Sequence, residues 1–324
     1  MSYGYYPGCS LSRSASPYDV STKAIAGPLG IDLVEVEDWN CCGATEYIAI
    51  NKTAAYALVG RNLALAAKQD GLEELVAPCS ACYLNLKKTD HYMGEYEELN
   101  AKVNKALAAG GLSYEPGTLK VRHLIDVIIN DVGYDAIGEK VTNPLSGLRL
   151  APYYGCLIVR PQFDTPPLDD PEYPTHLDKL LDTLGAEVVD FPLKTHCCGG
   201  HMAQISADTA YELIRRLLQN ATDYKADAIV TICPMCQLNL DAYQSNVNHH
   251  FGTNFQLPVL YFTQMIGLAM GMDPKSLGIG KEIVPAKPVL SKIGTEEESD
   301  DSDKSRRRRK DDKSLPMPKT KVEG

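Results

Sequence analysis

The sequence has no long apolar segment and no pattern typical of a secretory leader. Its first residues, MSYGYYPGCS, contain neither a basic region nor an apolar one, so we expect no signal peptide. The most apolar stretch, 257–272, is only 16 residues long and is interrupted by Thr263 and Gln264. A membrane-spanning helix needs about 20 apolar residues, so this stretch predicts a buried helix. We therefore expect a cytoplasmic protein.

Common cofactor and partner signatures are also missing. The glycines do not form the GxGxxG pattern of flavin and nicotinamide sites, and no CxxCxxCxxxCP run predicts a fused ferredoxin. The cysteines and histidines do not pair as in a zinc finger. A formal net charge of -10 argues against nucleic acid as a partner of the whole protein. Any electrons that this chain uses must come from a partner.

Cysteine, by contrast, is plentiful. The chain has ten cysteines among 324 residues, and 44% of its residues are hydrophobic, which is enough to bury a core without a disulfide scaffold. Structural disulfides are rare in the cytoplasm. The cysteines therefore indicate metal or redox chemistry.

All ten cysteines fall into an internal repeat with an offset of about 150 residues. Three motifs occur twice: a tyrosine pair followed by a cysteine, a CCG motif, and a CxxC motif followed by xLNL. The copies are Tyr5–Cys9 and Tyr153–Cys156, Asn40–Gly43 and His196–Gly199, and Cys79–Leu86 and Cys233–Leu240. The sequence therefore predicts two fused copies, 1–145 and 146–284, with five cysteines each.

Each copy predicts the element order β-α-β-α-β-α. Strands are expected at 2–6, 31–37, 74–77, 148–154, 187–191 and 228–232. Helices are expected at 18–29, 46–69, 175–184 and 206–224, and a further helix opens at each CxxC motif. This order is typical of an α/β fold with a parallel sheet. Because sites form at the carboxyl ends of such strands, the five cysteines of a copy should converge. If the copies pack face to face, the two sites can face each other.

The last segment, 285–324, differs from both copies in composition. Residues 296–303 hold six acidic side chains, and residues 304–313 hold seven basic ones. Blocks of like charge usually stay disordered, so we predict a solvated, self-neutralising tail. A basic docking arm for a partner or nucleic acid is the alternative.

Five thiolates per copy exceed the needs of ordinary metal sites. Soft thiolates select iron–sulfur clusters, zinc or Cu(I), but a structural zinc takes four ligands and a cubane cluster takes four cysteines. Adjacent cysteines point in different directions, which suits two irons of an extended cluster. The glycine that follows them permits positive φ and close approach of the backbone. Alternatives are cysteines buried as small hydrophobes, a redox dithiol and zinc.

The duplicated motifs resemble the CCG-domain family, and residues 1–284 resemble the B-type subunit of heterodisulfide reductase. This resemblance implies two tandem Rossmann-like CCG domains, each binding a non-cubane [4Fe-4S] cluster through five cysteines. The implied cofactor-binding and iron-ligating residues are Cys9, Cys41, Cys42, Cys79 and Cys82 in the first copy, and Cys156, Cys197, Cys198, Cys233 and Cys236 in the second. The gap before the second CCG motif is longer, 40 residues against 31, which suggests a loop difference.

The resemblance also implies an activity. The chain would be an oxidoreductase acting on a sulfur group: it would reduce a disulfide, the coenzyme M–coenzyme B heterodisulfide or an analogue, to two thiols, with one electron from each cluster. The setting would be methanogenesis or another anaerobic energy metabolism. The implied partners are the ferredoxin-like C-type subunit of a heterodisulfide reductase complex, with its flavin-containing A-type subunit. Alternatives are an electron-transfer subunit of a quinone-linked or sulfur-oxidising complex, and a zinc-bearing interaction module.

Cations near the cysteines are candidates for catalytic roles, because the implied disulfide is anionic. Arg13 and Arg160 each lie four residues after the first cysteine of their copy, and His201 lies three residues after Cys198. We expect these three side chains to pair with an anionic group of the substrate or to donate a proton. Lys194 and His196 lie near the same CCG motif.

Overall fold

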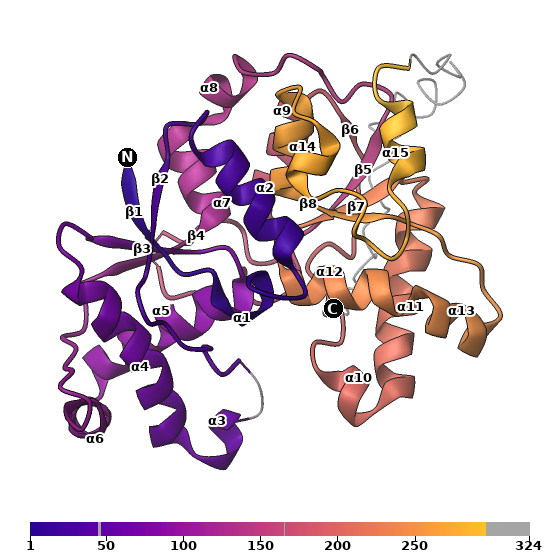
Figure 1. Cartoon of the computed structure of the whole chain (residues 1–324). Coiled ribbons are helices and arrows are strands. Elements are labelled where there is room, and N and C mark those ends of the chain that lie inside the picture. Colours follow the sequence, from indigo (N-terminus) through magenta and orange to yellow (C-terminus); the bar gives the residue numbers. More distant parts are fainter. Residues whose placement is uncertain (45–46, 165, 296–324) are drawn as a thin grey trace, which may run out of the picture. The chain divides into compact units, whose positions relative to one another are not determined.

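Two four-stranded parallel sheets form the centre of the computed structural model (Figure 1). The structure describes residues 1–44, 47–164 and 166–295. The strand orders are β2-β1-β3-β4 and β6-β5-β7-β8, so each copy builds the same sheet. The parallel α/β architecture and the duplication predicted from the sequence are confirmed.

The strands are short, and each sheet has one strand more than the sequence predicted. They are β1 (Ser2–Tyr5), β2 (Asp32–Glu35), β3 (Glu74–Ala77), β4 (Lys120–His123), β5 (Arg149–Tyr153), β6 (Glu187–Val188), β7 (Ala228–Thr231) and β8 (Val259–Tyr261). The central strand β7 is buried at every residue, as expected for a parallel sheet covered on both faces. The unpredicted strands β4 and β8 are edge strands of four and three residues.

Helices cover the sheets of both copies. In the first copy they are α1 (Gly8–Leu11), α2 (Ser16–Ala26), α3 (Tyr47–Ile50), α4 (Lys52–Lys68), α5 (Ser80–Glu95), α6 (Glu97–Ala108), α7 (Leu124–Val127), the π-helix η1 (Ile128–Val132) and α8 (Tyr134–Gly138). In the second they are α9 (His176–Thr183), α10 (Met202–Ile205), α11 (Ala207–Asp223), α12 (Pro234–Ala242), α13 (Gln244–Phe251), α14 (Phe262–Ala269), the 3₁₀-helix η2 (Pro274–Leu277) and α15 (Lys287–Lys292).

The helix expected at 46–69 is in fact two helices. Asn51 lies between α3 and α4 with extended backbone angles, φ -151° and ψ 100°. Its side chain accepts a hydrogen bond from the Ala54 N–H at 3.0 Å, which is how an N-cap residue starts a helix. In the second copy Ser206 has the same extended conformation and separates α10 from α11. Both breaks lie a few residues after a CCG motif.

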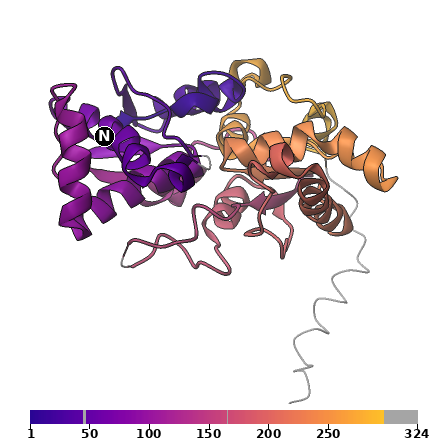
Figure 2. The same ribbon diagram turned by 90° about the horizontal axis from the view of Figure 1, so that it is seen from below.

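The two copies share one hydrophobic core. Helix α2 of the first copy packs against α14 of the second, as the views in Figures 1 and 2 agree. Tyr18 stacks on Tyr261 with ring centroids 4.3 Å apart, and the hydroxyls of Ser21 and Thr263 are hydrogen-bonded at 2.7 Å. Buried contacts of this kind fix the carboxyl ends of the two sheets relative to each other.

Two segments differ from the sequence-based expectation. The apolar stretch 257–272 forms the strand β8 before the buried helix α14, and no described helix is both long and apolar enough to span a membrane. The compact unit ends at Gly294, ten residues after the expected boundary at 284, because α15 buries Val289 and the Gly294 N–H donates to the Ser146 carbonyl at 2.9 Å. The charged blocks lie outside the described residues.

Candidate functional site

The five cysteines of the first copy come from the ends of three strands. Cys9 lies in α1 after β1, Cys41 and Cys42 follow β2, and Cys79 and Cys82 lie at the start of α5 after β3. The Sγ atoms of Cys41 and Cys9 are 3.4 Å apart, and those of Cys42 and Cys82 are 3.3 Å apart. The fold therefore gathers these thiols at one edge of the sheet.

The second copy repeats this arrangement at the ends of β5, β6 and β7. The thiols of Cys156 and Cys197 lie close enough to shift each other's pKa, upward for Cys156 and downward for Cys197, and the neighbouring thiols of Cys198 and Cys233 raise the pKa of Cys236. The convergence expected from strand order is thus present in both sheets.

Two glycines allow backbone to pass close to the sulfurs. Gly8 and Gly155 have φ values of 72° and 68°. A Cβ atom on either one would lie 2.9 Å from a cysteine Sγ atom, that of Cys82 and that of Cys236 respectively. Glycine is required at both positions for two reasons. It tolerates the left-handed backbone, and it leaves space beside the sulfur. The CCG glycines also have positive φ, as predicted.

The two cysteine sets meet in the interior. The thiols of Cys79 and Cys233, one from each copy, are both buried and lie close enough that each shifts the other's pKa, upward for Cys79 and downward for Cys233. The carbonyls of Pro78 and Ile232, which directly precede these cysteines, both lie within hydrogen-bond distance of the buried Tyr18 hydroxyl, at 3.0 Å and 3.1 Å. One hydroxyl therefore joins the loops that carry the two CxxC motifs.

The thiols differ in how readily they ionise. Hydrogen bonds from Cys42 and Cys9 and from the Gly43 N–H lower the pKa of Cys41 to about 2, and the hydrogen bond to Cys41 raises the pKa of Cys42 to about 11. In the second copy the hydrogen bond from Cys156 lowers the pKa of Cys197 to about 6. Because thiolate is the metal-binding form of cysteine, each set contains a ready ligand.

The donor chemistry of the two sets fits an iron–sulfur group. Each set offers five soft sulfur ligands, and the glycines beside Cys82 and Cys236 leave room for backbone near a bulky inorganic core. Among the residues that the structure describes, no three His, Cys, Asp or Glu side chains gather as tightly as the ligands of one metal ion.

Comparison with known proteins agrees with this geometry. Residues 3–87 and 150–241 match the family model of the CCG cysteine-rich domain. The chain belongs to the CCG family. Each matched segment lies within one copy and contains all five cysteines of that copy.

This chain aligns with nearly the whole length of each of its relatives. The chain is 34% identical over 284 residues to the 8-methylmenaquinol:fumarate reductase membrane anchor subunit of Wolinella succinogenes, covering 88% of this chain and 97% of that one. It is 32% identical over 289 residues to the B-type subunit of the ferredoxin:CoB-CoM heterodisulfide reductase from Methanosarcina mazei, covering 88% and 95%. A protein of Archaeoglobus profundus, named as similar to the same subunit type, is 31% identical, covering 90% and 98%. The resemblance to the B-type subunit of heterodisulfide reductase is confirmed.

A solved structure shares the fold. The crystal structure of a hypothetical protein from Helicobacter pylori superimposes with a TM-score of 0.68 at 15% identity, covering 88% of this chain and 52% of that chain. This CCG chain therefore spans about half the length of that protein, and the similarity concerns the fold alone.

The candidate cations of the two CCG domains are not equivalent. Arg160 donates to the Thr195 carbonyl at 2.9 Å and pairs with Glu172 at 3.3 Å, so it supports the loop before Cys197. Arg13 is exposed, and its side chain has no ion pair within the described part of the chain. His201 is half-buried at the N-cap of α10. Their roles toward a substrate stay predictions.

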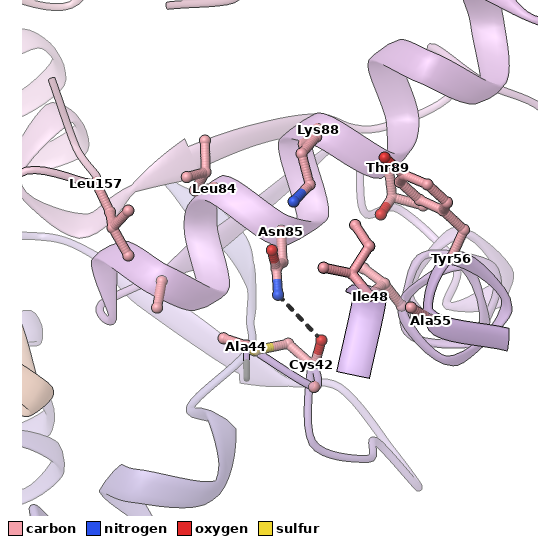
Figure 3. A pocket seen from close by; sticks show the side chains of 13 residues that line it. Cys42, Ala44, Ile48, Ala55, Tyr56, Leu84, Asn85, Lys88, Thr89 and Leu157 are labelled. Carbon is pink, nitrogen blue, oxygen red and sulfur yellow. Dashed lines mark hydrogen bonds between the residues drawn. The ribbon is translucent and has the colours of Figure 1, made fainter. Parts of the chain in front are cut away.

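Three further residues near the cysteines were not singled out from the sequence. Tyr18 joins the two CxxC loops, and His123 is fully buried with its Nε2 atom 3.4 Å from the Ser80 hydroxyl. Lys88 lines a pocket beside Cys42 (Figure 3). None of the three belongs to a repeated motif, so the internal comparison could not reveal them. The one available signal was a lysine six residues after a CxxC cysteine.

Proposed function

We propose that this chain is the disulfide-reducing subunit of a heterodisulfide reductase-like complex, and that each CCG domain holds one non-cubane [4Fe-4S] cluster through its five cysteines. The observation that carries the proposal is the meeting of the two cysteine sets at Cys79 and Cys233. One disulfide could then lie near both sets. Relatives named for the B-type subunit of heterodisulfide reductase support it.

The reaction sets the requirements of the site. Reduction of RS–SR′ to RSH and R′SH consumes two electrons and two protons and breaks one sulfur–sulfur bond. When bound, two clusters supply one electron each. The protein's part is positional: Gly8 and Gly155 make room beside the sulfurs, and the helices that open at the CxxC motifs favour thiolate through their N-terminal dipoles. Tyr18 holds the two CxxC loops together.

The electrons must reach the clusters from outside. We propose that the donor is a ferredoxin-like C-type subunit, which in turn receives electrons from a flavin-containing A-type subunit. Ile50 and Ile205 support a docked partner, because both are strongly exposed, 79% and 66%, and each ends the short helix after a CCG motif. The cytoplasmic location expected from the sequence stays a prediction.

A second candidate function has support of its own. The relative from Wolinella succinogenes is a subunit of an 8-methylmenaquinol:fumarate reductase, so the same two-site architecture could pass electrons between a quinol and another subunit. In that case the chain would carry electrons without reducing a disulfide.

The test uses the full-length chain, purified and loaded with clusters without oxygen. Reduced viologen serves as electron donor, and the coenzyme M–coenzyme B heterodisulfide or a simpler disulfide serves as acceptor. The proposal predicts two thiols released and two viologens oxidised per disulfide. Reduction of the clusters by a menaquinol, with no thiol released from any disulfide, would favour the quinone-linked candidate instead.

A further inference from the structure

A pocket of about 180 Å³ opens beside Cys42 in the first CCG domain. Its walls come mainly from α4 and α5, and Leu157 of the second domain also lines it (Figure 3). The wall is largely apolar, with Ile48, Val59 and Leu84 among its residues. The pocket therefore connects a cysteine of the first set to a sheltered apolar space.

Three polar groups that line this apolar pocket have no hydrogen-bond partner among the residues that the structure describes. Lys88 has no hydrogen bond or ion pair with any described residue, and in Figure 3 its ammonium points toward Asn85. Thr89 is only 1% exposed, and its Oγ1 atom is buried without a hydrogen-bond partner. Tyr56 offers a hydroxyl that makes no hydrogen bond within the described ranges. Leaving a buried polar group unpaired is unfavourable, so a ligand that satisfies these groups would bind favourably.

The charge of the ligand follows from the positive charge of Lys88. Its ammonium lines a largely apolar wall and has no carboxylate partner in the described part of the chain, where an unpaired charge is unfavourable. An anion would offset that cost, and the apolar walls would strengthen the attraction by lowering the local dielectric constant. The hydroxyls of Thr89 and Tyr56 can donate to the same anion.

The second CCG domain lacks this lysine. Cys82 and Asn85 of α5 correspond to Cys236 and Asn239 of α12, and both asparagines donate to the carbonyl of a CCG cysteine, at 3.2 Å and 3.1 Å. The same alignment places Ala242 at the position of Lys88. The two domains are alike around the sulfurs but differ in the pocket.

We propose that this pocket binds a small anionic group of the substrate, a sulfonate, carboxylate or phosphate on a short apolar chain, paired with Lys88 and hydrogen-bonded by Thr89 and Tyr56. Such binding would direct the attached sulfur toward Cys42 and give an unsymmetrical disulfide one orientation. This inference names a ligand subsite for the proposed function and rests on it for the identity of the substrate.

Equilibrium binding to the cluster-loaded chain tests the subsite apart from catalysis. The probes are the disulfide of 2-mercaptoethanesulfonate, which is anionic, and the disulfide of 2-mercaptoethanol, which is neutral and similar in length. K88A should weaken binding of the anionic probe about ten- to a hundred-fold and leave the neutral probe within about twofold. K88R should retain most of the affinity, and T89V should weaken anionic binding about threefold or more.

The control is K102A, which removes an exposed lysine of α6 that pairs with Glu98 at 2.6 Å. It should bind both probes like the unaltered chain, and all variants should keep the same iron content. Equal anionic affinity in K88A and K102A, or no anionic binding by the unaltered chain, would overturn the subsite. Lysine-dependent binding without thiol release would uphold the subsite and contradict the disulfide reductase function.

Discussion

Gly8 lies so close to a cysteine sulfur that there is no room for a Cβ atom. Its φ of 72° belongs to the left-handed region, and an added Cβ atom would approach the Cys82 Sγ atom to 2.9 Å. Gly30 has nearly the same φ, 71°, but a Cβ atom there would meet nothing within 4 Å. A substitution at Gly30 would strain the backbone only, whereas a substitution at Gly8 would strain the backbone and also obstruct the sulfur.

We predict that G8A loses the group held by the first copy while G30A retains it. Both variants should lose about 1–2 kcal/mol of stability from the left-handed backbone, but only G8A displaces a ligand. Iron content should fall in G8A from about eight to about four atoms per chain and stay unchanged in G30A. Equal iron in the two variants would show that the space beside Cys82 is not needed.

At the residue scale, the sequence predicted the cysteines but not their surroundings. The ten cysteines stand out because the chain contains two copies of one pattern, and comparing the copies separates their shared motifs from the background. Tyr18 and Lys88 occur in one copy only, so a comparison of the two copies does not identify them. Their partners, the Ile232 carbonyl and the pocket wall at Leu157, come from the other copy and become visible only when the chain is folded.

Among the elements, β4 is the clearest case of a strand that the sequence concealed. Its residues KVRH look polar, but Arg122 is only 5% exposed. It pairs with Glu74 of β3 at 2.9 Å and with Asp126 at 2.7 Å, and it also bonds Asp131. These carboxylates raise the pKa of Arg122 against the effect of its burial. Ion pairing with Glu74 of the neighbouring strand and with two carboxylates that follow in the sequence therefore makes a charged residue part of the interior.

This network predicts a large effect of R122A. Removing the guanidinium leaves three carboxylates without their partner, and breaking a buried ion pair costs about 3–5 kcal/mol. K120A, on the same strand, removes a side chain that is 63% exposed and lies 3.3 Å from Glu74, so it should cost less than about 1 kcal/mol. The thermal unfolding midpoints of the two variants, measured without oxygen, should differ clearly. Equal midpoints would contradict the assigned role of Arg122.

Strand β8 and helix α15 were missed because they are short. Strand β8 has three residues, too few for a period-two pattern to be distinguished from the apolar helix that follows it. Helix α15 has six residues and begins with a proline in its first turn, within a segment whose composition predicts disorder. Helix α11 and the central strands β1, β3, β5 and β7 were predicted to within about one residue at each end, because the helix has a long apolar periodicity and the strands are apolar.

For the whole molecule, the decisive feature is that the two copies place their cysteine sets together. The sequence alone does not predict how the two copies pack. It predicts facing sites only on the condition that the copies pack face to face. The packing depends on specific contacts of α2, with Tyr261 at the end of β8 and with Thr263 of α14, and on the Tyr18 hydroxyl between the two CxxC loops.

Y18F tests whether this junction matters for function. The variant keeps the ring that stacks on Tyr261 but leaves two buried carbonyls without their shared donor, which should cost about 1–3 kcal/mol. We expect each CCG domain to keep its iron while disulfide reduction slows. Y5F is the matched control, because the buried Tyr5 donates to Asp19 at 2.8 Å within the first copy. If Y5F and Y18F slow the reaction equally, the junction has no special role.

The most direct test of the account is the content of iron, acid-labile sulfide and zinc per chain, measured on protein purified and reconstituted without oxygen. Two four-iron clusters predict about eight iron and about eight sulfide per chain, with no zinc. One or two zinc ions with little iron, under conditions that load clusters, would contradict the account and favour a zinc-bearing interaction module.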